Sequence, residues 1–220
     1  MIGNRNSYTA VAVFGGTFNP VHYGHLRSAL ELCSELELSE LRLMPCHQPV
    51  HRDEPDCSAQ QRLAMLDLAV EVEPALSIDR REINRSGPSY TVDSLIDIRA
   101  ELGEQTALCM VVGSDAFAKL ETWHRWQELL DYAHIVVLAR PGYSGPDSDS
   151  LNQWLHKVQV STRAELFENI AGSVLMVELT QLLISASAIR EQIQSGKSPR
   201  FLLPEPVWQY IREQKLYGIT

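Results

Sequence analysis

The sequence has few cysteines, no long apolar run and no excess of positive charge. Its four cysteines among 220 residues are too few for a disulfide scaffold, and none forms a CxxC pair. Nowhere does the chain approach the roughly 18 consecutive apolar residues of a membrane-spanning helix, and residues 1–15 lack the pattern of a signal peptide. We therefore expect a cytoplasmic protein with reduced thiols.

Negative charge predominates, with 28 Asp and Glu against 19 Lys and Arg and a formal net charge of -9. Such a chain has no general attraction for nucleic acid or for an anionic membrane, so neither is expected as a partner. Residues 53–79 hold seven acidic residues and one basic residue, whereas residues 14–27 hold one basic residue, two histidines and no acid. We expect the acids to lie on outer helices, away from any site that binds an anion.

Apolar runs alternate with stretches of helical periodicity along the chain. Strands are predicted at residues 8–14, 41–44, 76–79, 107–112, 135–139 and 174–179, and helices at residues 26–36, 63–70 and 91–102. This order is typical of parallel strands joined by crossover helices. The predicted fold class is therefore α/β, a Rossmann-like open, mainly parallel sheet with helices on both faces.

The chain length favours one compact domain over residues 1–220. The polar segment at residues 141–150 is the one candidate linker, and we interpret it as a surface loop. Only one more obvious strand and two helices are expected beyond it, as an extension of the same sheet.

The segment GGTFNPVHYGH follows the first predicted strand and precedes the first helix. Ligands of open parallel sheets bind at the carboxyl ends of strands, where Gly15 and Gly16 would let backbone amides approach a phosphate. His22 and His25 could both face a polyphosphate at the start of the helix, where the helix dipole favours an anion. The alternative is a tight turn with capping histidines.

A second segment, ISASAIR, follows the last apolar strand. Ser185 and Ser187 are suitable N-cap residues for the helix that follows. Arg190 places a cation near the positive end of that helix dipole, which is unfavourable unless an anion occupies the site. The alternative is a solvated surface arginine.

The two motifs closely resemble the GGTFDPxHxGH and ISSTxIR signatures of the nucleotidyltransferase superfamily. Within it, the chain resembles the nicotinate-nucleotide adenylyltransferase family along its length. The resemblance implies a single nucleotidyltransferase domain that joins ATP and nicotinate mononucleotide, giving deamido-NAD and pyrophosphate in NAD biosynthesis. The chain departs from the signatures at Asn19, where Asp is common, and at Ala186, where Ser is common.

The resemblance also implies residue roles. Charge on the transition state would be stabilised by His22, His25, Ser187 and Arg190. The other residues expected to bind ATP are Phe14, Gly15, Gly16, Thr17, Gly113, Ile184 and Ser185. Those expected to bind the nicotinate nucleotide are Gly16, Thr17, Asn19, His51, Arg52, Tyr90, Thr91, Asp115, Trp123 and His124.

Two of these assignments have a direct physical reason. The flat ring of Trp123 would stack on the pyridine ring, although core packing is the commoner use of a tryptophan. Backbone N–H groups at Thr91 and His124 would hold the ring carboxylate in preference to a carboxamide, because the NH2 of a carboxamide cannot accept a hydrogen bond.

No metal site of the protein's own is predicted, and Mg²⁺ is expected to arrive with the triphosphate. A zinc site formed by Cys46, His47, His51 and Cys57 is the rival interpretation of that loop, although its spacing does not match the usual zinc motifs. Three functional alternatives stay open: transfer to nicotinamide mononucleotide or phosphopantetheine, a module that binds ATP without turnover, and a zinc-dependent interaction domain.

Overall fold

The computed structural model describes residues 9–47, 56–85, 87, 89–139, 143, 145–180 and 182–219. The strands of this described part form one sheet in the order β3-β2-β1-β4-β5-β7-β6. The pairs β1–β4, β4–β5, β5–β7 and β6–β7 are all parallel. The strands are β1 (Thr9–Gly16), β2 (Glu40–Pro45), β3 (Leu76–Ile78), β4 (Thr106–Gly113), β5 (His134–Ala139), β6 (Gln159–Val160) and β7 (Val174–Glu178).

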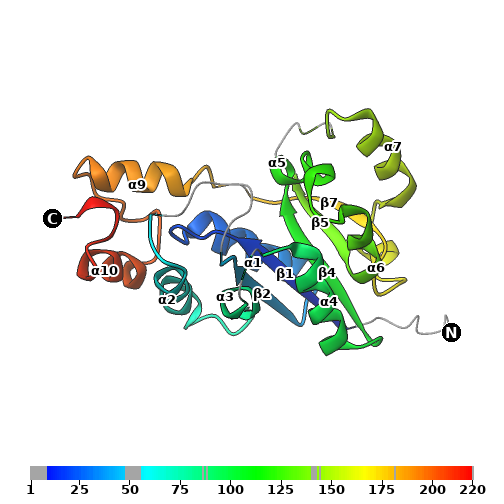
Figure 1. Cartoon of the computed structure of the whole chain (residues 1–220), viewed down its shortest axis with the longest axis horizontal. Helices are drawn as coiled ribbons and strands as arrows, with labels where there is room; N and C mark the ends of the chain where they lie inside the picture. The colour runs from blue at the N-terminus through cyan, green and yellow to red at the C-terminus, as the bar shows by residue number, and fades with distance from the viewer. Residues whose placement is uncertain are drawn as a thin grey trace. The chain divides into compact units, whose positions relative to one another are not determined.

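Helices connect these strands and follow the last one (Figure 1). The α-helices are α1 (Tyr23–Leu36), α2 (Ala59–Val70), α3 (Arg81–Asn84), α4 (Thr91–Leu102), α5 (Ser114–Phe117), α6 (Leu129–Tyr132), α7 (Asp149–Val158), α8 (Arg163–Leu166), α9 (Ala186–Gln194) and α10 (Glu205–Glu213). Short 3-10 helices are η1 (Leu120–Thr122), η2 (Trp126–Glu128) and η3 (Leu216–Gly218). The predicted α/β class and mainly parallel sheet are thus confirmed.

The chain forms two compact units. Unit 1 comprises Met1–Phe14, Cys33–Leu41 and Tyr90–Leu179, and unit 2 comprises Gly15–Leu32, Arg42–Ser89 and Thr180–Thr220. Each unit is therefore built from three separate stretches of sequence. The assignment of residues 1–220 to one domain stays a prediction.

Unit 1 is built around β4 and β5, the most apolar strands in the sequence. Residues 107–112 of β4 are all buried, because a central parallel strand packs on both faces. In Figure 1, β4, β5 and β7 lie side by side, with α5 against β4 and β5, and α6 between α4 and β5. Helix α4 ends at Leu102, as predicted, and is followed by Gly103, whose φ of 66° is readily adopted by glycine.

Unit 2 carries most of the C-terminal helices. Its helix α10 packs on α2, and η3 packs on both α9 and α10. Helix α2 begins with a capping box, in which the Ser58 side chain accepts from Gln61 N and the Gln61 side chain accepts from Ser58 N. Val207 and Ile211 of α10 are fully buried, so the amphipathic C-terminal helices close a core of their own.

The expectation of one strand and two helices beyond residue 150 is wrong. The structure adds the helix α7, whose Leu151 and Leu155 are buried, together with β6 and the single-turn helix α8. Strand β6 has two residues and α8 has four, so neither is long enough to show a hydrophobic period. Among the described residues, no helix is both long and apolar enough to cross a membrane.

Candidate active site

In unit 2, the first motif folds into the turn between β1 and α1. The carbonyl of His22 accepts from Leu26 N at 3.2 Å and from His25 N at 2.9 Å, so His22 stands at the N-terminal cap of α1. The rings of His22 and His25 are stacked, with centroids 3.7 Å apart and an interplanar angle of 23°. The ring of His25 also packs edge-to-face with the ring of Phe18, with centroids 5.0 Å apart. Both imidazoles thus lie at the positive end of the helix dipole.

Two glycines of this motif are required by ring packing. A Cβ at Gly24 would lie 2.9 Å from His22 Nδ1, and a Cβ at Gly16 would lie 2.9 Å from the ring of Phe18. Real Cβ atoms do not approach other atoms so closely, so each glycine makes room for the neighbouring ring. Close approach of a phosphate to Gly16 stays a prediction.

Burial sets the charge of His22. Its side chain is almost inaccessible, and desolvation lowers the pKa of His22 from 6.5 to about 4, so the ring is neutral at pH 7. Its Nδ1 is buried and makes no hydrogen bond to any described residue. An unpaired buried nitrogen is costly, which makes this atom a candidate for a hydrogen bond to a ligand.

The second motif meets the first within unit 2. Ser185 is the N-cap of α9, since its side chain accepts from Ala188 N at 3.1 Å, whereas Ser187 lies exposed inside the helix. The carbonyl oxygen of Ile184 lies 3.5 Å from the position of a Cβ on Gly24. The start of the second motif therefore lies beside Gly24 of the first motif.

Arg190 is held by two partners in unit 2. Its Nη1 donates to the carbonyl of Asn19 at 2.8 Å, and its Nε lies 2.7 Å from Asp56 Oδ2. The alternative of a solvated surface arginine is therefore wrong. The expectation that the acids of residues 53–79 lie away from the motifs is wrong for Asp56, which contacts Arg190. The Asp56 carboxylate supplies the negative charge that compensates a cation near the start of a helix.

Asn19 points its side-chain oxygen into the interior of unit 2. Asn19 Oδ1 accepts from the Tyr217 hydroxyl at 2.8 Å and from Cys57 Sγ at 3.0 Å. Burial raises the pKa of Cys57 and of Tyr217, so both groups stay protonated and able to donate. The Asn19 side chain therefore anchors the turn, and its contact with a nucleotide stays a prediction.

The alternative prediction of a zinc site concerns the loop after β2. Cys46 Sγ donates to Thr17 Oγ1 across 3.9 Å, and the described residues include no group of three or more His, Cys, Asp or Glu that could hold a metal ion. His51 and Arg52, expected to bind the nicotinate nucleotide, lie outside the described residues.

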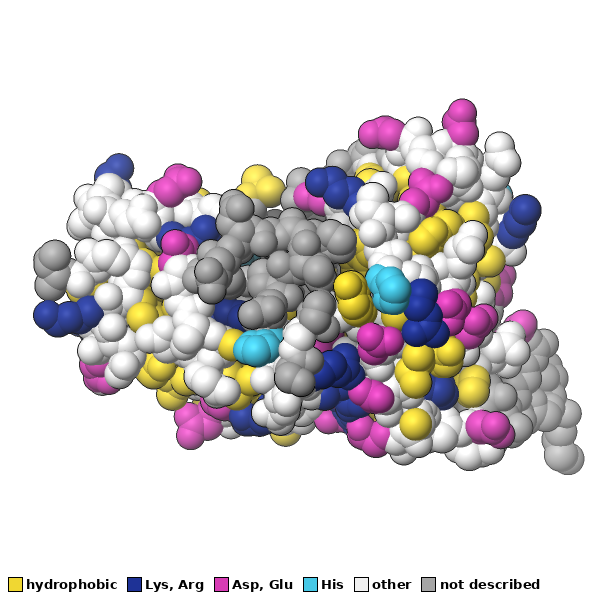
Figure 2. All heavy atoms as spheres, in the orientation of Figure 1, with side chains coloured by type: hydrophobic (Ala, Val, Ile, Leu, Met, Phe, Trp, Pro, Cys, Tyr) yellow, Lys and Arg dark blue, Asp and Glu magenta, His cyan; other side chains and the backbone are white. Residues whose placement is uncertain are grey.

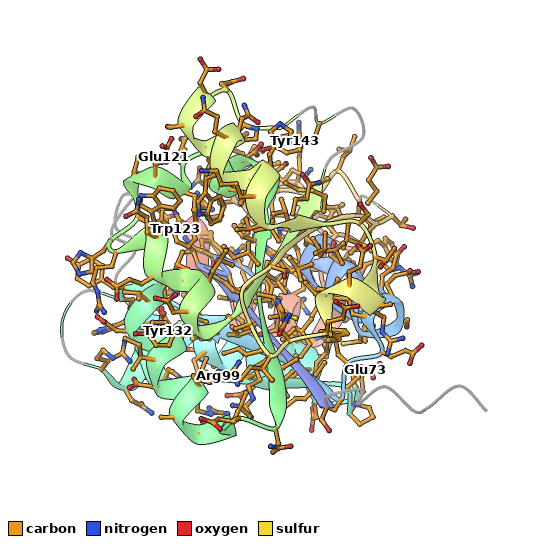
Figure 3. The ribbon with its side chains drawn as sticks, turned by 90° about the vertical axis from the view of Figure 1, so that its right-hand side faces the viewer. Glu73, Arg99, Glu121, Trp123, Tyr132 and Tyr143 are labelled. Carbon is orange, nitrogen blue, oxygen red and sulfur yellow. The ribbon has the colours of Figure 1, made fainter. Side chains whose placement is uncertain are left out.

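Unit 1 holds five of the residues expected to bind the nicotinate nucleotide, namely Tyr90, Thr91, Asp115, Trp123 and His124. Tyr90 is the N-cap of α4, and its ring packs against His124 with centroids 4.4 Å apart and an interplanar angle of 35°. Thr91 begins α4, where the geometry of a helix leaves the first N–H groups without intrahelical partners. Trp123 is half-buried and lies in the turn between η1 and η2, toward the end of the unit where β4 ends (Figure 3).

The remaining predicted residues of unit 1 lie at strand ends. Phe14 pairs with Val111 at the end of β1, and Gly113 ends β4. Asp115 follows in α5 and is exposed, close enough to raise the pKa of Tyr143 together with burial and Asp147.

Comparisons with known proteins agree with this geometry. A cytidylyltransferase-like family model matches residues 13–192. The chain is 50% identical over 207 residues to "Probable nicotinate-nucleotide adenylyltransferase" of Cellvibrio japonicus, covering 94% of this chain and 98% of the relative. It is 47% identical to the protein of the same name in Hahella chejuensis, with 96% and 97% covered. The chain belongs to the nicotinate-nucleotide adenylyltransferase family.

Solved structures support the fold of this nicotinate-nucleotide adenylyltransferase family member. The chain is similar to Plasmodium falciparum nicotinic acid mononucleotide adenylyltransferase complexed with NaAD, with a TM-score of 0.72, 14% identity and coverage of 97% of this chain and 99% of that chain. The same enzyme complexed with APC gives a TM-score of 0.68 at 16% identity, with the same coverage. At these identities the similarity shows the fold.

Four residues without a predicted role contact or lie beside the motif residues of this adenylyltransferase chain: Asp56, Arg62, Tyr143 and Tyr217. Only Arg62 left a signal in the sequence. It lies four residues before Leu66 and seven before Ala69, on the apolar face of α2, where an arginine is unusual. Asp56 and Tyr143 lie in loops, and Tyr217 lies in the three-residue helix η3, so these segments are too short or irregular to show a hydrophobic period.

Proposed function

We propose that this chain transfers the adenylyl group of ATP to nicotinate mononucleotide, forming deamido-NAD and pyrophosphate. A phosphate oxygen of the mononucleotide attacks the α-phosphorus of ATP, and the bond from that phosphorus to the β-phosphate bridging oxygen breaks. A phosphomonoester with a second pKa of about 6 is already largely dianionic at neutral pH, so this nucleophile needs no general base. The protein then has to position the phosphates and stabilise charge.

The stacked histidine pair is the observation that carries this proposal. His22 is neutral in the free protein, and its unpaired Nδ1 lies at the start of α1. A triphosphate placed there would favour the protonated imidazole, because a nearby anion raises the pKa of a histidine. His22 would then stabilise the departing pyrophosphate together with His25, Ser187 and the helix dipole.

Arg190 supplies the fixed cation of this arrangement. Asp56 contacts its Nε and the Asn19 carbonyl accepts from its Nη1, so the guanidinium is fixed in place. A pyrophosphate oxygen would accept from it as charge develops on the leaving group. We assign Mg²⁺ to the substrate: it would enter bound to the triphosphate and help neutralise the phosphate charge.

Recognition of the pyridine ring and its carboxylate is assigned to residues of unit 1. The pyridine ring would stack on Trp123, with its carboxylate on the N–H groups of Thr91 and His124. The Tyr90–His124 packing supports this, because it ties the start of α4 to the segment that follows Trp123. An acid would bind there more tightly than an amide, whose NH2 finds no acceptor.

The test compares three acceptors with Mg-ATP: nicotinate mononucleotide, nicotinamide mononucleotide and phosphopantetheine. We expect pyrophosphate release and a dinucleotide product to be fastest with the nicotinate compound. The His156→Ala variant, which changes an exposed histidine of α7, is the matched control and should retain wild-type rates. ATP binding without pyrophosphate release under any acceptor would identify a binding module instead.

A further inference from the structure

Arg62 is a buried arginine held by backbone oxygens. Arg62 lies on the apolar face of α2, and only 1% of its surface is exposed. Nη1 donates to the Thr17 carbonyl at 2.8 Å, and Nη2 donates to the carbonyls of Cys46 at 2.7 Å and His47 at 2.9 Å. No carboxylate pairs with it among the described residues. A buried charge of this kind needs a specific compensation, and here three carbonyl dipoles provide it at the two Nη atoms, whereas Nε is buried and makes no hydrogen bond to a described residue.

These carbonyls stand where two neighbouring segments leave the sheet within unit 2. Thr17 directly follows the last residue of β1, and Cys46 directly follows the last residue of β2. Cys46 N donates to the Gly16 carbonyl at 3.0 Å, so the two segments are paired there. Exposed carbonyl oxygens would repel a phosphate, which needs hydrogen-bond donors.

We propose that Arg62 is a positioning residue of the phosphate site. It turns three backbone oxygens toward its own guanidinium and holds Thr17 in place beside Gly16, so that the turn presents donors to a triphosphate. This inference rests on the proposed function, since it concerns how the same site accepts ATP. Arg62 itself touches no substrate.

Arg99 provides a matched comparison in unit 1. It also binds backbone carbonyls, donating to Thr106 at 2.7 Å, Gly103 at 2.8 Å, and Tyr132 and Ile170 at 3.0 Å. Thr106 begins β4, so this cluster lies at the end of the strand opposite Gly113 (Figure 3 labels Arg99 and Tyr132 there). None of its partners is a predicted site residue.

The experiment compares Arg62→Lys and Arg62→Met with Arg99→Lys and Arg99→Met by melting temperature and by steady-state kinetics well below melting. All four variants should melt earlier than wild type, because each leaves carbonyls unpaired. We expect KM for ATP to rise about tenfold in Arg62→Lys, because one ammonium group cannot donate to all three carbonyls as the planar guanidinium does. The rise should be larger in Arg62→Met, which has no donor. Both Arg99 variants should keep KM and kcat within about twofold of wild type, as expected for changes away from the site.

Two results would overturn this proposal. Arg62 variants that fold and keep the wild-type KM for ATP would confine Arg62 to stability, as would an Arg62→Lys variant that does not fold at all. The wild-type protein reports on the proposed function separately: absence of pyrophosphate release from wild type contradicts adenylyl transfer, whereas active wild type with unaffected Arg62 variants contradicts only the positioning role.

Discussion

Two buried histidines, His22 in unit 2 and His134 in unit 1, have similarly lowered pKa values but differ in the hydrogen bonds of their ring nitrogens. Burial lowers the pKa of each from 6.5 to about 4, so both rings are neutral at pH 7. His134 Nδ1 accepts from Ser173 N at 3.2 Å, which leaves Nε2 to donate to the Asn169 carbonyl at 3.0 Å. His22 Nδ1 has no such partner among the described residues.

The difference shows that a shifted pKa does not by itself identify a functional histidine. Burial is the largest cause of the lowered pKa at both sites, but only His134 has both ring nitrogens hydrogen-bonded by the fold. An unpaired buried polar atom costs about 1–3 kcal/mol, and a hydrogen bond to a bound phosphate would remove that cost. The unpaired Nδ1 therefore supports the phosphate-binding role that we propose for His22.

The largest expected effect comes from His22→Ala. Loss of a hydrogen-bond donor to the charge that develops in the transition state should lower kcat/KM by about 10²–10³-fold. Removing the buried ring opens a cavity and ends its stacking on His25, but it also removes the unpaired Nδ1. We therefore expect the free energy of unfolding to fall by about 1–2 kcal/mol, less than for His134→Ala. Pyrophosphate release and urea unfolding of the same preparation measure the two quantities. A variant with wild-type kcat/KM would remove His22 from the site.

His134→Ala should show the reverse pattern. The change leaves the Asn169 carbonyl and Ser173 N–H unpaired and opens a cavity, so we expect the free energy of unfolding to fall by about 2–4 kcal/mol. At temperatures well below melting, kcat/KM should match wild type. Loss of activity in fully folded His134→Ala protein would contradict the separation of the two histidines.

Acid should destabilise the protein through both histidines. Between pH 6.5 and 4 the unfolded state binds more protons than the folded state, because the folded pKa of each group is depressed. Stability therefore falls as pH falls through this window, by about 3 kcal/mol for each histidine when protonation is complete. Unfolding free energies measured from pH 7 to 4 test this, and His134→Gln should make the dependence shallower. If the unfolding free energy depends on pH equally in wild type and variant, His134 does not contribute to the loss of stability in acid.

Much of the fold could be predicted because its strands and longer helices bury regular faces. Apolar runs such as residues 107–112 and the glycine stop at Gly103 mark elements directly. Strand β6 and helix α8 could not be found this way, since they span too few residues to show a period. Figure 2 shows acidic and basic side chains interspersed on the visible surface. The count of acids in residues 53–79 did not predict where each one lies, since Asp79 from that stretch is buried against Arg81.

The motifs of the site could be predicted, but their internal contacts could not. The sequence indicated that His22, His25 and Arg190 act together. It gave no sign that Asp56 holds Arg190 or that Tyr217 holds Asn19 from 198 residues away. Such contacts join distant segments through single side chains, and neither periodicity nor local spacing records them.

The most direct test of the account is a titration of the histidine ring protons of wild-type protein by NMR, with and without pyrophosphate. In the free protein, His22 and His134 should both titrate with a pKa of about 4. Pyrophosphate should raise the pKa of His22 by about one unit or more, since a nearby anion favours the imidazolium, and should leave His134 unchanged. A His22 pKa that does not respond to pyrophosphate at saturation would contradict the assignment of His22 to the phosphate site.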